Sequence, residues 1–370
     1  MAAPGGERGR RRALTRASGP RSHAGAYLLL GASLALALVA SAAVSAFTFT
    51  PAQMGRYLGQ GLGWVPTTNA EALGRGVFLQ LRLPRVLLSG LTGAVLGVSG
   101  TLMQGLFRNP IVEPGLAGTS TGAALGAALV FVLGGATAFS AASTLGALAV
   151  PVVAFAGAFA ATMLVYRLST SFGTVNVFTL LLAGIAVNAL CAAGTGFLSY
   201  VARDPQARNI TFWNLGTFTT AEWRGVTIVA IVFGCGLLWC LGEAKTLNAL
   251  MLGEDEAASL GFDVGRAVRR LLIVNTVMVA AATAMVGVIA FVGLVVPHLL
   301  RLVRSSDYTF LIPGSALLGA LLMEVVDVVA RMVIAPAELP VGIITAVVGA
   351  PVFLLILLRQ QRAGVAGFRG

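Results

Sequence analysis

Long runs of apolar residues alternate along this chain with short polar connections, and these runs set the expected architecture. An α-helix rises 1.5 Å per residue, so about 20 apolar residues cross the roughly 30 Å hydrocarbon core of a bilayer. Eight runs approach or reach that length, and each predicts one transmembrane helix. The eight runs are residues 26–47, 84–106, 115–134, 145–166, 177–201, 225–242, 310–333 and 340–358.

A ninth apolar stretch, from Leu271 to Leu300, allows two interpretations. As one helix its 30 residues would be about 45 Å long, and as two full spans it would be about ten residues too short. Basic residues decide between them, because lysine and arginine concentrate on the cytoplasmic side of a membrane protein. Two short helices place 17 of the 25 basic residues inside and 8 outside, whereas one helix gives 13 and 12. We therefore predict ten spans with both termini in the cytoplasm.

The composition agrees with a membrane protein and excludes a soluble one. Of 370 residues, 57% are hydrophobic and 11% are charged, and the mean hydropathy is +0.89; a soluble domain has about 25% charged residues. We predict an all-α polytopic fold in three parts. These are a basic, disordered cytoplasmic tail at residues 1–25, a ten-span membrane domain at 26–360 and a short cytoplasmic carboxyl terminus at 361–370.

The net charge of +11 raises the question of a nucleic-acid partner. Much of it comes from the tail, which precedes a long apolar run and is followed by no folded basic domain. That arrangement is typical of a positively charged membrane anchor. We therefore expect a lipid bilayer as partner and no nucleic acid. The tail arginines are Arg8, Arg10, Arg11, Arg12, Arg16 and Arg21.

The sequence offers little for catalysis. It contains no GxxxxGK[ST] loop, so it has no nucleotide site of the P-loop kind. Its two histidines, His23 and His298, cannot assemble a metal cluster or a catalytic triad, and its three cysteines form no CxxC pair. We expect no catalytic residue, no metal site and no cofactor bound by this chain, which leaves passage of a solute through the bundle as the leading class of function.

An ion-coupled secondary transporter is the main alternative, because such proteins carry ionisable groups near the middle of the membrane. Glu324 and Asp327 in the ninth predicted span are the candidates for a proton relay. Asp327 and Arg331 lie four residues apart on one helix face, so a local ion pair explains them more simply. A structural membrane assembly factor is a third, weaker possibility.

The inner connection between the sixth and seventh spans predicts a short helix. Gly253 precedes three acidic residues, where a helix amino terminus favours negative charge, and Gly261 suits a left-handed stop. Ala257 and Leu260 are expected on one side of this two-turn helix. It is too short to persist alone, and it is either a docking element for a soluble partner or an ordinary loop helix. The acids are Glu254, Asp255 and Glu256.

Several motifs in order resemble the FecCD-type, BtuC-like permeases of ABC importers, which carry iron-siderophores, haem and cobalamin. The resemblance extends over nearly the whole chain after the tail. The motifs are LRLPR (81–85), GTLMQGLFRNPIVEPGLAGTSTGAALG (100–126), LGEDEAASLGFDVGRAVRR (252–270), GVIAFVGLVVPHLLRLV (287–303) and ELPVGIITAVVGAPVFLLILLR (338–359).

This resemblance implies a ten-span subunit with an inverted repeat of spans two to five against seven to ten. It implies pairing with a second copy, two cytoplasmic ATPase subunits that bind ATP and Mg, and a periplasmic substrate-binding protein. The helix at 254–260 matches the coupling helix of the family, which docks on the ATPase. By the same analogy, the fifth and tenth spans are expected to line the pathway of the cargo. Location in the bacterial inner membrane follows from the same resemblance.

Two arginines gain expected roles from the resemblance. Arg82 and Arg331 match family positions that pair with glutamates of the binding protein, and docking is the favoured role; ordinary anchors at the water interface are the alternative. Asn109 and Glu113, in the proline-broken inner turn at 108–115, are expected to be structural only.

The outer segment 202–223 is expected to form a short helix at the mouth of the pathway. It offers Arg203 and Arg208 near Phe212 and Trp213, a mixture of guanidinium and aromatic faces that suits an aromatic ring system bearing carboxylates. The segment also resembles those of haem permeases more than those of cobalamin permeases. Haem is therefore favoured as cargo over a ferric siderophore, although an interfacial aromatic belt explains the same residues.

Overall fold

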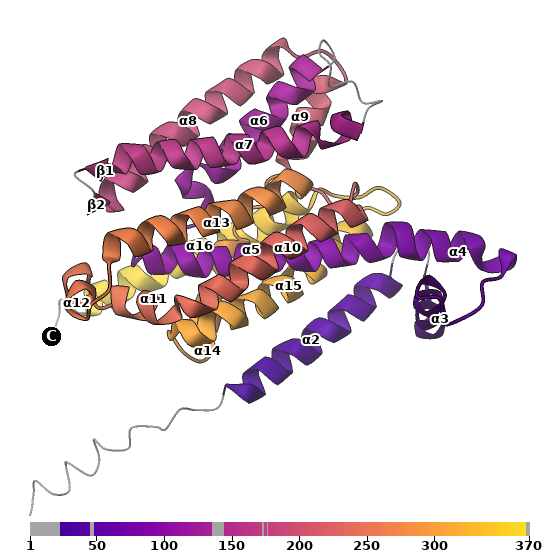
Figure 1. The fold of residues 1–370 in the computed structure, drawn as a ribbon, viewed down its shortest axis with the longest axis horizontal. Helices are drawn as coiled ribbons and strands as arrows, with labels where there is room; N and C mark the ends of the chain where they lie inside the picture. The colour runs from indigo at the N-terminus through magenta and orange to yellow at the C-terminus, as the bar shows by residue number, and fades with distance from the viewer. Residues whose placement is uncertain (1–22, 45–47, 135–143, 172–173, 176, 368–370) are drawn as a thin grey trace, which may run out of the picture.

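The computed structural model describes residues 23–44, 48–134, 144–171, 174–175 and 177–367, and almost all of this is helical (Figure 1). Within these ranges seven helices are long and apolar enough to cross a membrane, and three further helices have apolar segments of 10–17 residues. The ten helices are α2 (Ala24–Ala43), α5 (Leu83–Leu106), α6 (Thr119–Leu133), α7 (Thr144–Ser169), α8 (Val177–Val201), α10 (Trp223–Gly242), α13 (Val264–Val286), α14 (Val292–Val303), α15 (Tyr308–Met332) and α16 (Val341–Gly367).

Short elements connect these spans. A two-residue antiparallel pairing is the one departure from an all-α fold in the described ranges. The short helices are α3 (Pro51–Gly61), η1 (Asn69–Glu71), α4 (Ala72–Gly76), the π-helix η2 (Val77–Arg82), η3 (Pro114–Ala117), α9 (Gln206–Asn214), α11 (Ala244–Leu250) and α12 (Glu254–Ser259). The strands are β1 (Thr170–Ser171) and β2 (Thr174–Val175).

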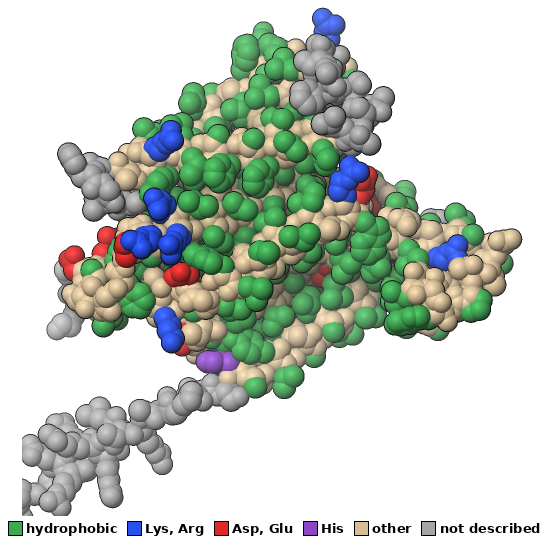
Figure 2. All heavy atoms as spheres, viewed as in Figure 1, with side chains coloured by type: hydrophobic (Ala, Val, Ile, Leu, Met, Phe, Trp, Pro, Cys, Tyr) green, Lys and Arg blue, Asp and Glu red, His purple; other side chains and the backbone are tan. Residues whose placement is uncertain are grey.

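The two ends of the bundle carry different short elements (Figure 1). One end carries α11 and α12 and the carboxyl terminus, and we call it the inner end in keeping with the predicted topology. The other carries α3, α4 and α9, and we call it the outer end. Apolar side chains cover the middle of the visible face, while basic ones gather at the inner end (Figure 2). That distribution is the one a bilayer imposes.

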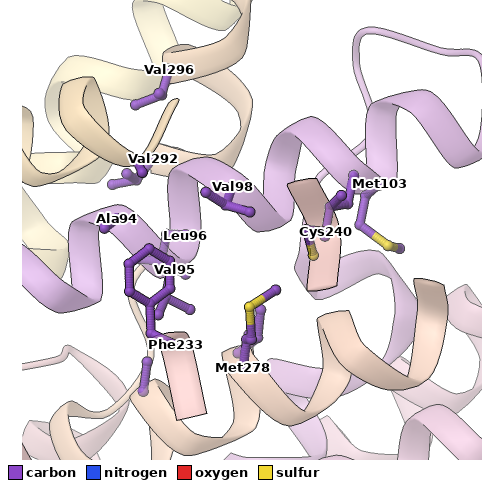
Figure 3. Close-up of a cluster of buried hydrophobic side chains, with 14 of the residues drawn as sticks. Ala94, Val95, Leu96, Val98, Met103, Phe233, Cys240, Met278, Val292 and Val296 are labelled. Carbon is purple, nitrogen blue, oxygen red and sulfur yellow. The ribbon is translucent and has the colours of Figure 1, made fainter. Parts of the chain in front are cut away.

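Helix α5 forms the centre of the bundle, and glycines allow its neighbours to approach it closely. Gly93 and Gly97 lie against backbone carbonyls of α15, and Gly100 lies against the carbonyl of Gly293 in α14, so a methyl group at any of the three would collide. Close backbone approach by small residues is how helices pack where lipid gives no hydrophobic drive. Figure 3 shows Val95 of α5 facing Phe233 of α10 in the surrounding core.

The division of the apolar stretch 271–300 into two helices is confirmed. Helix α13 ends before Gly287, whose φ is 81°, and α14 begins after Phe291, whose φ is 67°. The Glu113 carboxylate accepts a hydrogen bond of 2.6 Å from the Phe291 N–H and so caps α14. A side chain at Gly349 of α16 would collide with Phe291. Glu113 therefore has the structural role expected of it.

The structure adds helical detail beyond the predicted spans at two places. The outer segment 48–83, expected as a connection, is largely helical, and a continuous helical segment runs from Asn69 to Leu106. Helix α16 continues to Gly367, within the expected carboxyl-terminal segment 361–370, and the cytoplasmic location of that segment stays a prediction. The expected tail lies outside the described residues up to position 22.

Candidate functional site

The short inner helix predicted after the sixth span is present as α12. Gly253 before it has φ 138° and Gly261 after it has φ 89°, conformations that residues with side chains rarely adopt. Local sequence thus fixes both ends of this helix. The acids of its first turn are Glu254, Asp255 and Glu256.

The two faces of α12 have different environments. Ala257 is fully buried and anchors the helix to the bundle, and its carbonyl accepts a hydrogen bond of 3.1 Å from the Phe262 N–H. Leu260, three residues later, is 62% exposed: the helix ends at Ser259, and Leu260 lies in the terminal turn. Met251 and Leu252 are also exposed. These two residues and Leu260 form what we call the α12 apolar surface.

Polar contacts tie α12 and the preceding α11 to the spans. Arg108, after α5, pairs with Glu254 at 3.3 Å. Asn248 of α11 donates to the Asp307 carboxylate at 2.8 Å and accepts from the Tyr308 N–H at 3.0 Å. The start of α15 is therefore held by α11, which directly precedes α12.

Asp307 is the N-cap of α15. Its carboxylate accepts from the Thr309 N–H at 2.9 Å, as an N-cap does. Partial burial on its own raises the pKa of Asp307, but the hydrogen bonds from Asn248 and Thr309 outweigh it and lower the pKa below its usual value. The cap is consequently charged throughout the neutral range, where it favours the α15 amino terminus.

A second set of contacts connects α11 and the start of α15 to helices deeper in the bundle. Arg301 of α14 donates to the side chain of Gln104 in α5, and it lies 3.4 Å from the Tyr308 hydroxyl. The same hydroxyl lies 3.6 Å from the Met251 sulfur. Gly105 of α5 leaves room for the Tyr308 ring, since a methyl group there would lie 2.7 Å from the hydroxyl. Displacement of α11 and α12 would thus reach α5, α14 and α15 through named contacts.

A buried charge cluster lies at the outer end. Asp327 of α15 pairs with Arg331 at 3.1 Å, as the four-residue spacing predicts, and with Arg85 of α5 at 2.8 Å. Arg85 also pairs with Glu338, after α15, at 2.8 Å. We call Arg85, Asp327, Arg331 and Glu338 the outer charge cluster. Sequence reasoning missed Arg85 and Glu338, because the first is 242 residues from its main partner.

Arg82 and Arg331, the two expected docking residues, are buried, with only 7% and 6% of their surface exposed. Arg331 donates to the carbonyls of Ser41 and Val44 at the end of α2, and Arg82 donates to the Val44 carbonyl at 3.1 Å. Both side chains are thus held inside the bundle by backbone carbonyls, and their expected roles at the outer surface stay predictions. The last carbonyls of a helix lack partners within it, and these guanidinium groups supply them.

Glu324 and Asp327 have different partners. Glu324 is fully buried and accepts a hydrogen bond of 2.6 Å from the Ser89 hydroxyl. Asp327 is held between two guanidinium groups. A proton relay needs a carboxylate that is free to exchange its proton, and the pairing of Asp327 favours a structural role instead.

The outer helix predicted in segment 202–223 is α9, and it borders a cavity of about 460 Å³. The Arg208 guanidinium carbon lies 5.8 Å from the centre of the Phe212 ring, within cation–π range. Trp213 borders a neighbouring cavity of about 280 Å³ instead, and Arg203 lines neither of the two. The structure therefore brings together two of the four expected residues. Polar groups that line the larger cavity include Arg208, Asn209, Thr217, Thr219 and Glu338.

Comparison with known proteins gives one consistent answer. The profile of the FecCD transport family matches residues 33–359. The hemin transport system permease protein HmuU of Yersinia pestis is 44% identical over 303 residues, which cover 81% of this chain and 89% of that protein. The cobalamin import system permease protein BtuC of Halobacterium salinarum is 41% identical over 284 residues, or 76% and 74% of the two chains.

More distant relatives have the same character. The vitamin B12 import system permease protein BtuC of Salmonella typhi is 37% identical over 300 residues, 81% of this chain and 89% of its own. A solved structure of a metal-chelate type ABC transporter in an inward-facing conformation superposes with a TM-score of 0.77 at 28% identity. It covers 90% of this chain and 99% of that one.

Proposed function

This chain belongs to the FecCD transport family, and on that premise we propose that it is the permease of an ATP-driven importer whose cargo is haem. Membership makes it a multi-pass membrane permease of the ABC importer kind, a transport subunit that acts with ATPase and substrate-binding partners. Haem as the cargo is what we propose beyond family membership. A ferric siderophore is the second candidate.

One observation carries the choice of haem, namely the 44% identity to a hemin permease over 89% of its length. The outer cavity supports the choice, because Arg208 and Phe212 combine a cation with an aromatic face. Haem has a flat aromatic macrocycle and two carboxylates, which those two groups can stack against and pair with.

The inner end is suited to a soluble ATPase partner. The α12 apolar surface is exposed at the inner end, outside the spanning helices, and exposed apolar patches mark protein interaction sites. We assign α12, with its flanking Gly253, Leu260 and Gly261, as the coupling helix. ATP and Mg would be bound by that partner, and no residue of this chain performs covalent chemistry.

The proposed mechanism is alternating access. Closure of two ATPase subunits would push α12, and the contacts of Asn248 and Arg301 would pass the motion to α15, α14 and α5. A second copy of the chain would complete the pathway. Helices α8 and α16 have long exposed apolar faces that such a copy could cover.

The periplasmic binding protein is proposed to dock at the outer end. Arg82 and Arg331 can reach it only if their hydrogen bonds to Ser41 and Val44 break, since both are almost completely buried. Docking through these residues therefore requires the end of α2 to move. An Arg82→Glu, Arg331→Glu double variant is expected to weaken docking, and unchanged affinity for the binding protein would refute this assignment.

Uptake of cargo by the complete transporter in proteoliposomes tests the function. We expect ATP-dependent uptake of haem and not of cobalamin or a ferric hydroxamate. Arg208→Gln and Phe212→Ala should each lower haem uptake several-fold, because a cation–π or charge pair is worth about 1 kcal/mol or more. Arg203→Gln, on the same segment but outside the cavity, is the control. Uptake of cobalamin or a siderophore without haem would refute the proposed cargo.

A further inference from the structure

A groove on the membrane-facing surface between α10 and α13 belongs to neither the coupling region nor the outer cavity. Its volume is about 340 Å³ and its lining is almost wholly apolar. Along α10 it extends from Ile231 to Trp239, eight residues further on, which is about 12 Å at the helical rise and close to the roughly 15 Å depth of one leaflet. Its lining includes Ile231, Cys235, Trp239, Ile273, Val274 and Val277.

Arginines follow the same face of α13 toward the inner end. Arg270 precedes Ile273 and Val274 by three and four residues, and Arg266 precedes Arg270 by four, so all lie along one side of the helix. Arg269 lies four residues before Ile273. Figure 2 shows basic side chains gathered over the inner end of the bundle, where α13 begins.

Two of these arginines have no partner in the described part of the chain. Arg266 pairs with Asp263 at 3.1 Å. Arg269 and Arg270 are exposed, and no described carboxylate lies close enough to form an ion pair with either. Glu243 and the acids of α12 lie at the same end without reaching them. Two unpaired guanidinium groups therefore border the inner end of an apolar groove.

We propose that this groove binds an anionic phospholipid of the inner leaflet. One acyl chain lies between α10 and α13, and Arg269 and Arg270 hold the phosphate, for which the guanidinium fork is well matched. Trp239 lies at the inner end of the groove lining on α10, where indole rings favour the membrane interface. Basic residues just inside a spanning helix are the pattern that attracts anionic headgroups. This lipid site is separate from the proposed transport function. A lipid bound there would stabilise the position of α13, the helix that directly follows α12.

The reactivity of Cys235 measures lipid binding in the groove directly, because this thiol is exposed there while Cys191 and Cys240 are buried. The full-length permease in neutral detergent would be labelled with an apolar maleimide during titration with phosphatidylglycerol or with phosphatidylcholine of identical chains. Each arginine near a phosphate is expected to contribute about fivefold. Phosphatidylglycerol should therefore protect Cys235 at about 25-fold lower concentration than phosphatidylcholine.

Matched variants separate a specific site from general surface charge. Arg270→Gln should raise the protecting concentration of phosphatidylglycerol about fivefold. Arg167→Gln, an exposed arginine at the inner end of α7, should leave it unchanged. Val277→Phe fills the groove without altering charge and should reduce retention of phosphatidylglycerol in native mass spectrometry. Equal protection by the two lipids, equal effects of the two arginine variants, or full retention by Val277→Phe would each overturn the proposal.

Discussion

At the scale of single residues, Asp327 is the charge on which the outer end depends. Its carboxylate is fully buried and shared between Arg85 and Arg331. Removing one member of a buried ion pair leaves its partner's charge without a counter-charge in a low dielectric. This lowers stability more than replacing all the paired charges with apolar groups. Glu338 contributes to the same cluster from a partly exposed position, and among the described residues its ion-pair partner is Arg85.

We therefore expect Asp327→Ala to lower the stability of the permease by about 3–5 kcal/mol. Glu338→Gln should cost far less, because water can replace its single contact. Thermal unfolding of both variants in one detergent measures the difference. Equal losses would show that the cluster does not depend on Asp327.

Sequence reasoning recovered part of this cluster for a physical reason. Asp327 and Arg331 lie one helical turn apart, so the pair is readable from spacing alone. The burial of Arg331 and Arg82 could not be read in this way, since it depends on the end of α2, some 290 residues from Arg331. A signal was present in α2, which has no basic residue in its last turn to satisfy its final carbonyls.

At the scale of elements, α12 was predictable because its determinants are local. Two glycines with positive φ and an acidic first turn mark where the helix begins and ends. The environment of Leu260 was not predictable, because it follows from the packing of Ala257 against the bundle. The α12 apolar surface is the consequence, and its importance can be measured.

Leu260→Asp should reduce binding of the ATPase partner about 30-fold, the effect of losing a central interface residue worth about 2 kcal/mol. The permease itself should keep its melting temperature, since Leu260 is 62% exposed. Leu62→Asp serves as control because Leu62 is 60% exposed at the outer end. Co-purification with the ATPase measures binding, and undiminished binding by Leu260→Asp would remove the α12 apolar surface from the coupling interface.

The break between α13 and α14 shows a different limit of sequence reasoning. Counting basic residues correctly predicted that the stretch 271–300 is divided. The position of the break depends on Glu113, which caps α14 from 178 residues away, and on Gly349, which leaves room for Phe291. Each contact is tertiary, so hydropathy located the two helices without locating their junction.

At the scale of the whole molecule, the contacts describe a path from the inner end to the centre. The α11–α12 region holds the start of α15 through Asn248, and Tyr308 and Arg301 join α15 to α14 and α5. Glycines bring the backbones of α5, α14 and α15 together, so these helices are expected to move as one body. Force applied at α12 therefore has a route into the bundle, whereas Asp327, one of the two candidate relay carboxylates, is held between two arginines.

This arrangement predicts that the chain cannot concentrate its cargo without its ATPase. The purified permease in liposomes with an imposed proton gradient should show no uphill uptake of haem, because Asp327 is paired with two arginines and no nucleotide motif is present in the chain. Adding the binding protein, the ATPase and ATP should start uptake, and Glu324→Gln should leave that rate within about twofold, as expected for a buried group outside the driving step. Uptake driven by the gradient alone and abolished by Glu324→Gln would instead make this chain an ion-coupled carrier.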